Sequence, residues 1–206
     1  ADTMRLHIMF IGEFEKAVSW SNEAVKGSKR FLDRVWNLAE SCSSSLDITP
    51  AKESAIHKTI KKVTLDIDDL KMNTAISAMM SLVNTLSANG CSKGDMRQLL
   101  LLLSPFAPHM VEELWERLGF AAASGCMACQ AQWPTWDEAK TVDATVEMAV
   151  QVCGKLRATI VVPMDSDEET VVSAALAVEK IAKIAEGKKL LKVIHIKNKL
   201  VNLILK

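Results

Sequence analysis

The spacing of apolar residues changes at about residue 144, and this change sets the fold class. Before that point apolar side chains recur every three or four residues, the period of an amphipathic helix; one such series is Ile56, Ile60, Val63, Ile67 and Leu70. Beyond it they alternate with their neighbours, the period of a half-buried strand; the first such series is Val146, Met148, Val150 and Val152. We therefore expect an α+β protein, mainly a helical bundle followed by a small strand-strand-helix-strand-strand domain.

Capping and breaking residues divide residues 1–118 into the helices of the bundle. Ser21 or Asn22 can cap a helix that runs to about residue 39, and Pro50 suits the first turn of the next helix. Gly119 is placed to end the last one. The expected helices cover about 22–39, 51–70, 73–86 and 94–118, the last interrupted by the two prolines of segment 104–108.

The rest of the chain has two parts. Residues 119–143 show no apolar period, so we expect an irregular connector that Trp133 and Trp136 pack against its surroundings. Residues 144–206 form the small domain: Ser166 and Glu169 make a capping box for a helix that reaches Glu186, and strands lie on both sides of it. The expected strands are 146–152, 156–162, 192–196 and 200–205.

Composition excludes several classes of protein. Hydrophobic residues make up 49% of the 206 residues and the formal net charge is zero, whereas disordered chains combine low hydrophobicity with high net charge. No apolar run is long enough to span a bilayer, and no signal peptide opens the sequence. Five cysteines without regular spacing favour free thiols in a reducing compartment. We expect a cytoplasmic monomer without a membrane partner.

The sequence contains no recognisable catalytic or metal-binding motif. Gly-x-Gly-x-x-Gly, the P-loop and Gly-x-Ser-x-Gly are absent, and the four histidines have no metal-ligand spacing. Cys126 and Cys129 resemble half of a zinc site, but no second pair completes the four ligands that a closed site needs. We expect neither a catalytic residue nor a metal site in this chain.

Basic residues are grouped in a way that points to a polyanion. Residues 144–206 hold ten basic against seven acidic residues, and no acid follows Glu186. Arg30 and Arg34 share one helix face, and Lys58 and Lys62 share another. Two basic faces on adjacent helices could converge on one phosphate backbone, although solvated helix faces have the same composition.

The turns of the small domain carry a second group of cations. Lys155 and Arg157 flank the first expected turn, and Lys197 and Lys199 flank the second. If the two hairpins lie side by side, these four cations gather at one end of the sheet and contact nucleic acid by its backbone. The alternative is that they only keep a small domain soluble.

Ordered segments along nearly the whole chain resemble the C-terminal third of bacterial-type leucyl-tRNA synthetases. Segments 2–10, 20–36, 57–64, 73–76 and 104–115 follow the family's order, although the last is shared with the valyl, isoleucyl and methionyl relatives. The features that point to the leucyl family are Val150–Lys155 with Arg157, and Lys199–Asn202.

The resemblance implies a class Ia anticodon-binding-like bundle over residues 1–118 and a C-terminal tRNA-binding domain over 144–206, joined by 119–143. The implied partners are tRNA-Leu and the catalytic and editing domains of a parent chain. The parent would use ATP and Mg to join leucine to tRNA, while this piece would need no cofactor and would be inactive alone.

The sequence also departs from the family pattern. Cys153 stands where the family usually has Asn, a better turn residue, and the Cys126–Cys129 pair is not part of the pattern. The family's His-Ile-Gly-His and Lys-Met-Ser-Lys-Ser motifs are missing. Two other functions stay open: a free-standing protein-interaction module on the same fold, and a metal- or thiol-dependent enzyme that uses Cys126 and Cys129.

Overall fold

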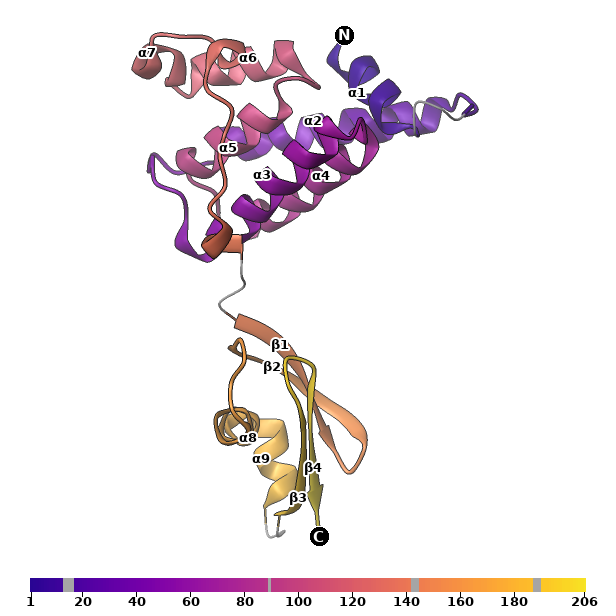
Figure 1. Cartoon of the computed structure of the whole chain (residues 1–206), viewed down its shortest axis with the longest axis vertical. Coiled ribbons are helices and arrows are strands. Elements are labelled where there is room, and N and C mark those ends of the chain that lie inside the picture. The colour runs from indigo at the N-terminus through magenta and orange to yellow at the C-terminus, as the bar shows by residue number, and fades with distance from the viewer. Residues whose placement is uncertain (13–16, 89, 142–144, 187–189) are drawn as a thin grey trace. The chain divides into compact units, whose positions relative to one another are not determined.

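The computed structural model describes residues 1–12, 17–88, 90–141, 145–186 and 190–206. The chain divides into two units, residues 1–142 and 143–206 (Figure 1), and each has its own apolar core. No helix in these described ranges is both long and apolar enough to cross a membrane. The expected α+β class is confirmed, with helices in the first unit and a four-stranded sheet in the second.

The first unit is helical, and its helices begin and end close to the expected residues. Ser21 caps α2 by accepting a hydrogen bond from the Ala24 amide, Pro50 opens the turn before α3, and Gly119 adopts a φ of 84° after α6. The helices are α1 (Asp2–Phe10), α2 (Asn22–Glu40), α3 (Glu53–Asp68), α4 (Met72–Ser87), α5 (Lys93–Leu103), α6 (Pro108–Arg117) and α7 (Phe120–Ser124).

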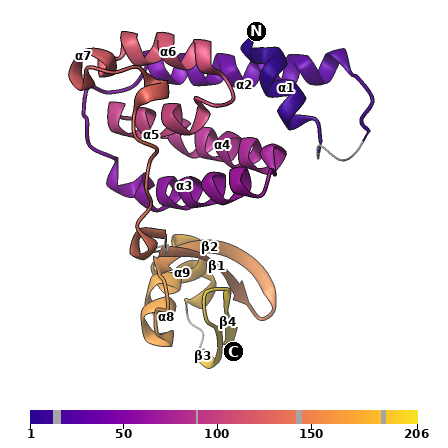
Figure 2. The ribbon, with the colours of Figure 1, turned by 45° about the horizontal axis from the view of Figure 1, so that its top comes forward.

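Helix α4 is central to the bundle. It packs along α3 and also contacts α1, α2 and α5 (Figure 2). Its apolar side chains Ile76, Met79 and Val83 are fully buried. They meet the apolar faces of the surrounding helices, which include Val35, Ile60, Val63, Leu99 and Leu102. This packing leaves one polar face of α4 at the surface, between α2 and α3.

The segment after α6 is more ordered than its sequence suggested. It contains α7 and the short 3-10 turns η2 (Ala128–Gln130) and η3 (Glu138–Thr141). Trp133 packs against the bundle and donates its indole N–H to the Thr64 hydroxyl at 2.9 Å, while Trp136 is also partly buried there. Tertiary contacts with α3 hold this segment, and such contacts leave no apolar period in the sequence.

The second unit is a four-stranded sheet in the order β2-β1-β4-β3, with two helices on one face (Figure 1). Val150, Ile160, Val201 and Leu203 face those helices and are buried. The pairings β1–β2 and β3–β4 are antiparallel hairpins, whereas β1 and β4 are parallel neighbours. The strands are β1 (Thr145–Val152), β2 (Lys155–Pro163), β3 (Leu190–Ile196) and β4 (Leu200–Leu205).

The helical part of this unit differs from the expectation in two ways. Asp167, and not Ser166, caps the helix by accepting a hydrogen bond from the Thr170 amide at 2.8 Å, because the Ser166 hydroxyl donates to the Pro163 carbonyl. The single expected helix is two, α8 (Glu168–Ala177) and α9 (Glu179–Ala185), because Val178 is extended. The sequence also offers Gly187 as a stop after the expected helix end at Glu186, but Gly187 lies outside the described residues.

Candidate nucleic-acid interface

Helix α4 lies between the two basic helix faces that the sequence singled out. On one side, the Arg34 guanidinium of α2 donates to the Asn84 side-chain oxygen of α4 at 2.7 Å. On the other side, Lys58 and Lys62 of α3 line a groove of about 410 Å³ together with residues of α4. Arg30 is exposed one turn before Arg34. The bundle therefore presents one pair of cations, Arg30 and Arg34, on one side of α4 and a second pair, Lys58 and Lys62, on the other side.

Lys61 stands beside Lys62 in the sequence but is engaged on another side of α3. The Lys61 ammonium is paired with the Glu138 carboxylate at 2.6 Å, and this contact lowers the pKa of Glu138. The neighbouring His57 is buried, and its Nδ1 atom accepts a hydrogen bond from the Asp137 amide at 3.0 Å. The segment around η3 thus covers one side of α3 and leaves Lys58 and Lys62 on the side of α4.

Lys62 is held in place by an acid on its own helix. Its ammonium lies 2.7 Å from the Asp66 carboxylate, whose side chain is only 9% exposed, while the Lys62 side chain is 54% exposed. The pair is four residues apart on α3, a spacing that brings side chains together. This contact fixes the direction of the Lys62 side chain, because the buried Asp66 carboxylate has little freedom to move.

Sequence reasoning missed α4 as a part of this surface. The helix has no charged residue along its 16 positions, MNTAISAMMSLVNTLS, and its exposed residues include Ser77, Ser81, Asn84 and Thr85. An exposed helix usually carries charges on its outer face. The lack of charge between two basic helices was the signal that could have revealed it, but the sequence does not show which helices are neighbours.

The four cations of the small unit do not gather at one end of the sheet, and that expectation is wrong. Lys155 pairs with Val152 at the end of β1, whereas the Lys199 carbonyl accepts from the Ala149 amide. Because β1 and β4 run parallel, the turn after β1 and the turn before β4 lie at opposite ends of this pair. Lys155 and Arg157 form one group, and Lys197 and Lys199 form another.

Each turn has its own local support. Cys153 and Gly154 have φ values of 50° and 79°, the two positive values of a tight hairpin turn, and the Asn202 side chain accepts from the Gly154 amide. In the second turn, Asn198 accepts from the Asp165 amide and donates to the Asp165 carboxylate, both at 2.9 Å. These bonds hold the backbone of each turn and leave Lys155, Lys197 and Lys199 exposed.

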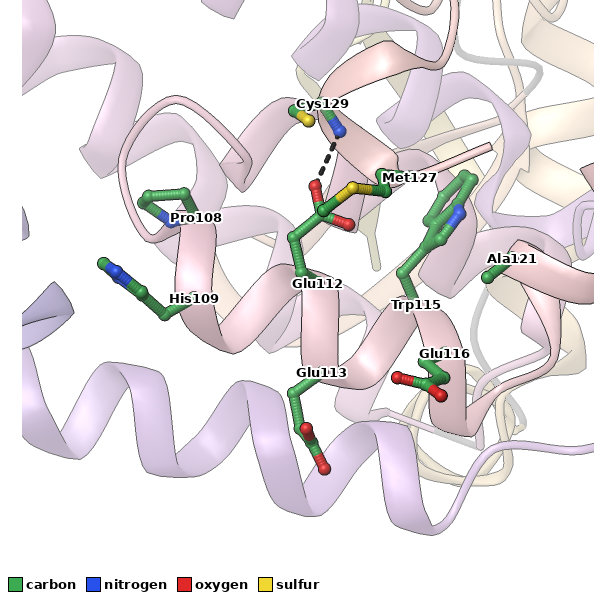
Figure 3. A pocket seen from close by; sticks show the side chains of 9 residues that line it. All are labelled: Pro108, His109, Glu112, Glu113, Trp115, Glu116, Ala121, Met127 and Cys129. Carbon is green, nitrogen blue, oxygen red and sulfur yellow. Dashed lines mark hydrogen bonds between the residues drawn. The ribbon is translucent and has the colours of Figure 1, made fainter. Parts of the chain in front are cut away.

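Of the two cysteines Cys126 and Cys129, only Cys129 lines a pocket of about 550 Å³ between α6 and the following segment (Figure 3). The Glu112 carboxylate accepts hydrogen bonds from the Ala128 and Cys129 amides, each at 2.8 Å, and the bond from Cys129 is drawn in Figure 3. A hydrogen bond with Glu112, together with burial, raises the pKa of the Cys129 thiol. A raised pKa reduces the thiolate that nucleophilic or metal-binding chemistry needs.

The same pocket is unsuited to a polyanion. Its wall includes the carboxylates of Glu112, Glu113 and Glu116 of α6 (Figure 3), and their negative charges repel phosphate. In the part of the chain that the structure describes, no group of three or more His, Cys, Asp or Glu residues is placed to hold a metal ion. The described cations and the neutral face of α4 are therefore the features suited to a nucleic acid.

Three comparisons bear on identity. The family model "Anticodon-binding domain of tRNA ligase" matches residues 53–172, which include parts of both units. A leucine–tRNA ligase of Alkaliphilus oremlandii (strain OhILAs) is 46% identical over 207 residues, covering all of this chain and 25% of that protein. This chain thus spans a quarter of the length of that curated relative.

A solved structure is also similar over the whole chain. It is the ternary complex of Agrobacterium radiobacter K84 AgnB2 LeuRS with tRNA and LeuAMS, 28% identical with a TM-score of 0.62, of which this chain covers 29%. Since the family model covers more than half of the chain and these two proteins match its full length, the chain belongs to the family of anticodon-binding domains of tRNA ligases.

Proposed function

We propose that this chain is the tRNA-binding part of a leucine–tRNA ligase. The observation that carries the proposal is the 46% identity to a leucine–tRNA ligase along the full length of the chain. The similar solved structure is a LeuRS in complex with tRNA, which supports tRNA as the ligand. The chain would hold tRNA-Leu while the catalytic domain of its parent attaches leucine.

The described surface supports a role in positioning. Cations that contact phosphates supply affinity and orientation without reading bases, and folded RNA is recognised largely through its shape and backbone. Arg30, Arg34, Lys58 and Lys62 would form a contact on the bundle. The two turn groups, Lys155 with Arg157 and Lys197 with Lys199, would form separate contacts on the small unit.

The chemistry of aminoacylation would belong to other domains of the parent. ATP and Mg would bind there, where the class I motifs reside, and this chain would work in the cytoplasm as part of a monomer. Without those motifs the chain cannot position ATP phosphates for reaction. We expect the isolated chain to show no leucine-dependent ATP–pyrophosphate exchange.

The other two functions have less support. A thiol- or metal-dependent enzyme requires a reactive pair, but Glu112 raises the pKa of Cys129. A protein-interaction module would not require cations on both sides of α4. Such a module would bind tRNA weakly and without preference for tRNA-Leu.

Binding of tRNA tests the proposal directly. Affinity for a tRNA-Leu transcript is measured by fluorescence anisotropy between about 50 and 200 mM salt, with a non-cognate tRNA as competitor. The log–log salt slope becomes shallower by about 0.7 to 0.9 for each phosphate that is no longer neutralised, so Lys58→Ala/Lys62→Ala should reduce it by up to about 1.8.

A matched control removes the same charge elsewhere. Lys140 of η3 and Lys183 of α9 do not line the groove and are not among the proposed phosphate contacts, so Lys140→Ala/Lys183→Ala should leave the slope nearly unchanged. Wild-type protein that does not bind tRNA-Leu, or that binds it no better than the non-cognate tRNA, would overturn the proposed function.

A further inference from the structure

The groove between α3 and α4 has two chemically different walls. The α3 wall carries Lys58 and Lys62, and the α4 wall carries Thr74, Ser77 and Ser81. None of its described lining residues is acidic; besides those five they are Thr59 and Ala78. A cationic wall faces a neutral hydroxyl wall across about 410 Å³ of open space.

The serines of the α4 wall present acceptors rather than donors. The Ser77 hydroxyl donates to the Asn73 carbonyl at 3.0 Å, and the Ser81 hydroxyl donates to the Ser77 carbonyl at 3.1 Å. A hydroxyl has one proton and two lone pairs, so both oxygens can still accept a hydrogen bond while these backbone contacts persist. A phosphate oxygen has no proton to offer them, whereas a ribose 2′-hydroxyl does.

The two walls together match the two sides of an RNA strand. Along such a strand, phosphates alternate with riboses, so a cationic wall and an acceptor wall can engage both at once. The position of Lys62 is already set by Asp66 at 2.7 Å. None of the described residues that line the groove is acidic, so no lining side chain repels phosphates. The positive charge lies on the α3 wall only.

We propose that the α3–α4 groove holds the sugar–phosphate backbone of one tRNA strand, with Lys58 and Lys62 on phosphates and Ser77 and Ser81 accepting hydrogen bonds from 2′-hydroxyls. This inference rests on the proposed function and adds to it a reason for RNA selectivity. The 2′-hydroxyl is the group that distinguishes RNA from DNA at a binding site.

Removing the acceptors is the first test. Ser77→Ala/Ser81→Ala should weaken tRNA-Leu binding by about three- to tenfold, the size of one or two net hydrogen bonds, with little change in the salt slope. Ser124→Ala is the matched control, because the Ser124 hydroxyl makes the same type of backbone contact on α7, to the Phe120 carbonyl at 2.7 Å, but does not line the groove. It should bind like wild type. Alanine has a high helix propensity, so these substitutions should leave the helices intact. Circular dichroism checks that each variant is folded.

Changing the RNA tests the partner of these serines. Two tRNA-Leu transcripts, one with 2′-fluoro pyrimidines and one with 2′-fluoro purines, cannot donate from the substituted positions. At least one should bind wild type about three- to tenfold more weakly, and it should bind Ser77→Ala/Ser81→Ala no more weakly than the unmodified transcript does. Equal weakening in the two proteins would show that the serines do not contact 2′-hydroxyls.

A charge placed in the groove tests proximity to the backbone. Ser81→Asp should weaken binding by about tenfold or more, because the added carboxylate would repel the phosphates that lie in the groove. Ala122→Asp adds the same charge in the first turn of α7, which contacts α6, and should have little effect.

The possible failures are distinguishable. Absence of tRNA-Leu binding by wild type would remove the proposed function. Wild-type binding that stays unchanged in the serine and Ser81→Asp variants would remove the groove from the interface and leave the proposed function standing.

Discussion

The Asp2 carboxylate of α1 caps α6, which begins more than a hundred residues later. Its two oxygens accept hydrogen bonds from the His109 ring nitrogen Nδ1 and from the Met110 amide, each at 2.7 Å. The Asp2 side chain is 10% exposed. Pro108 starts α6 without an amide proton, and Asp2 satisfies the Met110 amide, one of the amides of the first turn that have no partner within the helix.

Replacing Asp2 should therefore destabilise the bundle. Asp2→Ala is expected to lower its free energy of unfolding by about 1 to 2 kcal/mol, the usual value of a helix cap. All five tryptophans lie in the first unit, so tryptophan fluorescence during urea unfolding reports on this unit alone. Asp33→Ala, which removes an exposed acid paired with Lys29, should cost well under about 1 kcal/mol. Equal destabilisation by the two substitutions would contradict the capping role.

The same contact predicts a dependence on pH. Burial raises the pKa of Asp2, but the hydrogen bonds from His109 and Met110 outweigh it, and the net pKa is lowered from 3.8. A lowered pKa gives stability that is present above the unfolded-state value and is lost as the pH falls through the folded-state value. The difference in unfolding free energy between wild type and Asp2→Ala should shrink when the pH drops from about 6 to about 3. A constant difference over that range would show that the charge of Asp2 is unimportant.

Cys153 is strained in the first turn of the small unit. Its φ of 50° is unfavourable for most side chains but is tolerated by Asn. Cys153→Asn should stabilise the unit by about 0.5 to 1 kcal/mol, seen as slower amide hydrogen exchange in β1 and β2. Gly154→Ala, at a φ of 79° with no atom within 4 Å of the added carbon, should speed exchange through backbone strain alone. Faster exchange in Cys153→Asn would mean that the thiol makes a contact of greater value than the turn geometry.

The two turns of the small unit should act independently on tRNA. The pairs Lys155→Ala/Arg157→Ala and Lys197→Ala/Lys199→Ala lie at opposite ends of the β1–β4 pair, and distant substitutions usually have additive free energies. If each pair makes two phosphate contacts, each should reduce the log–log salt slope by about 1.4 to 1.8, and the fourfold variant by the sum. An unchanged slope in a folded variant would remove that turn from the interface.

The Cys129 thiol should be slow to react at neutral pH. Its pKa is raised by the hydrogen bond with Glu112 and by burial, so Glu112→Gln should increase its rate of alkylation by iodoacetamide, since a lower pKa leaves more thiolate at neutral pH. The midpoint of the rate against pH should move down. A rate that increases equally at every pH would instead indicate greater exposure.

Elements that depend on neighbouring residues could be predicted from local sequence. The switch of apolar period at residue 144 follows from the geometry of helices and strands, so the bundle and both hairpins could be predicted from it. Ser21, Pro50 and Gly119 mark helix ends for local reasons of hydrogen bonding and backbone conformation. The resemblance to leucyl-tRNA synthetases likewise depends on ordered residues alone.

The way these elements meet became known only from the folded chain. The four hairpin cations are divided because β1 pairs with β4 in parallel, and that pairing joins residues some fifty positions apart. Asp167 replaces Ser166 as the cap because Ser166 finds the Pro163 carbonyl. Lys61 is neutralised by Glu138 from a distant segment, and α4 becomes a wall of the candidate interface because it lies between α2 and α3. These outcomes come from burial and pairing between remote segments, and local sequence patterns carry no record of such contacts.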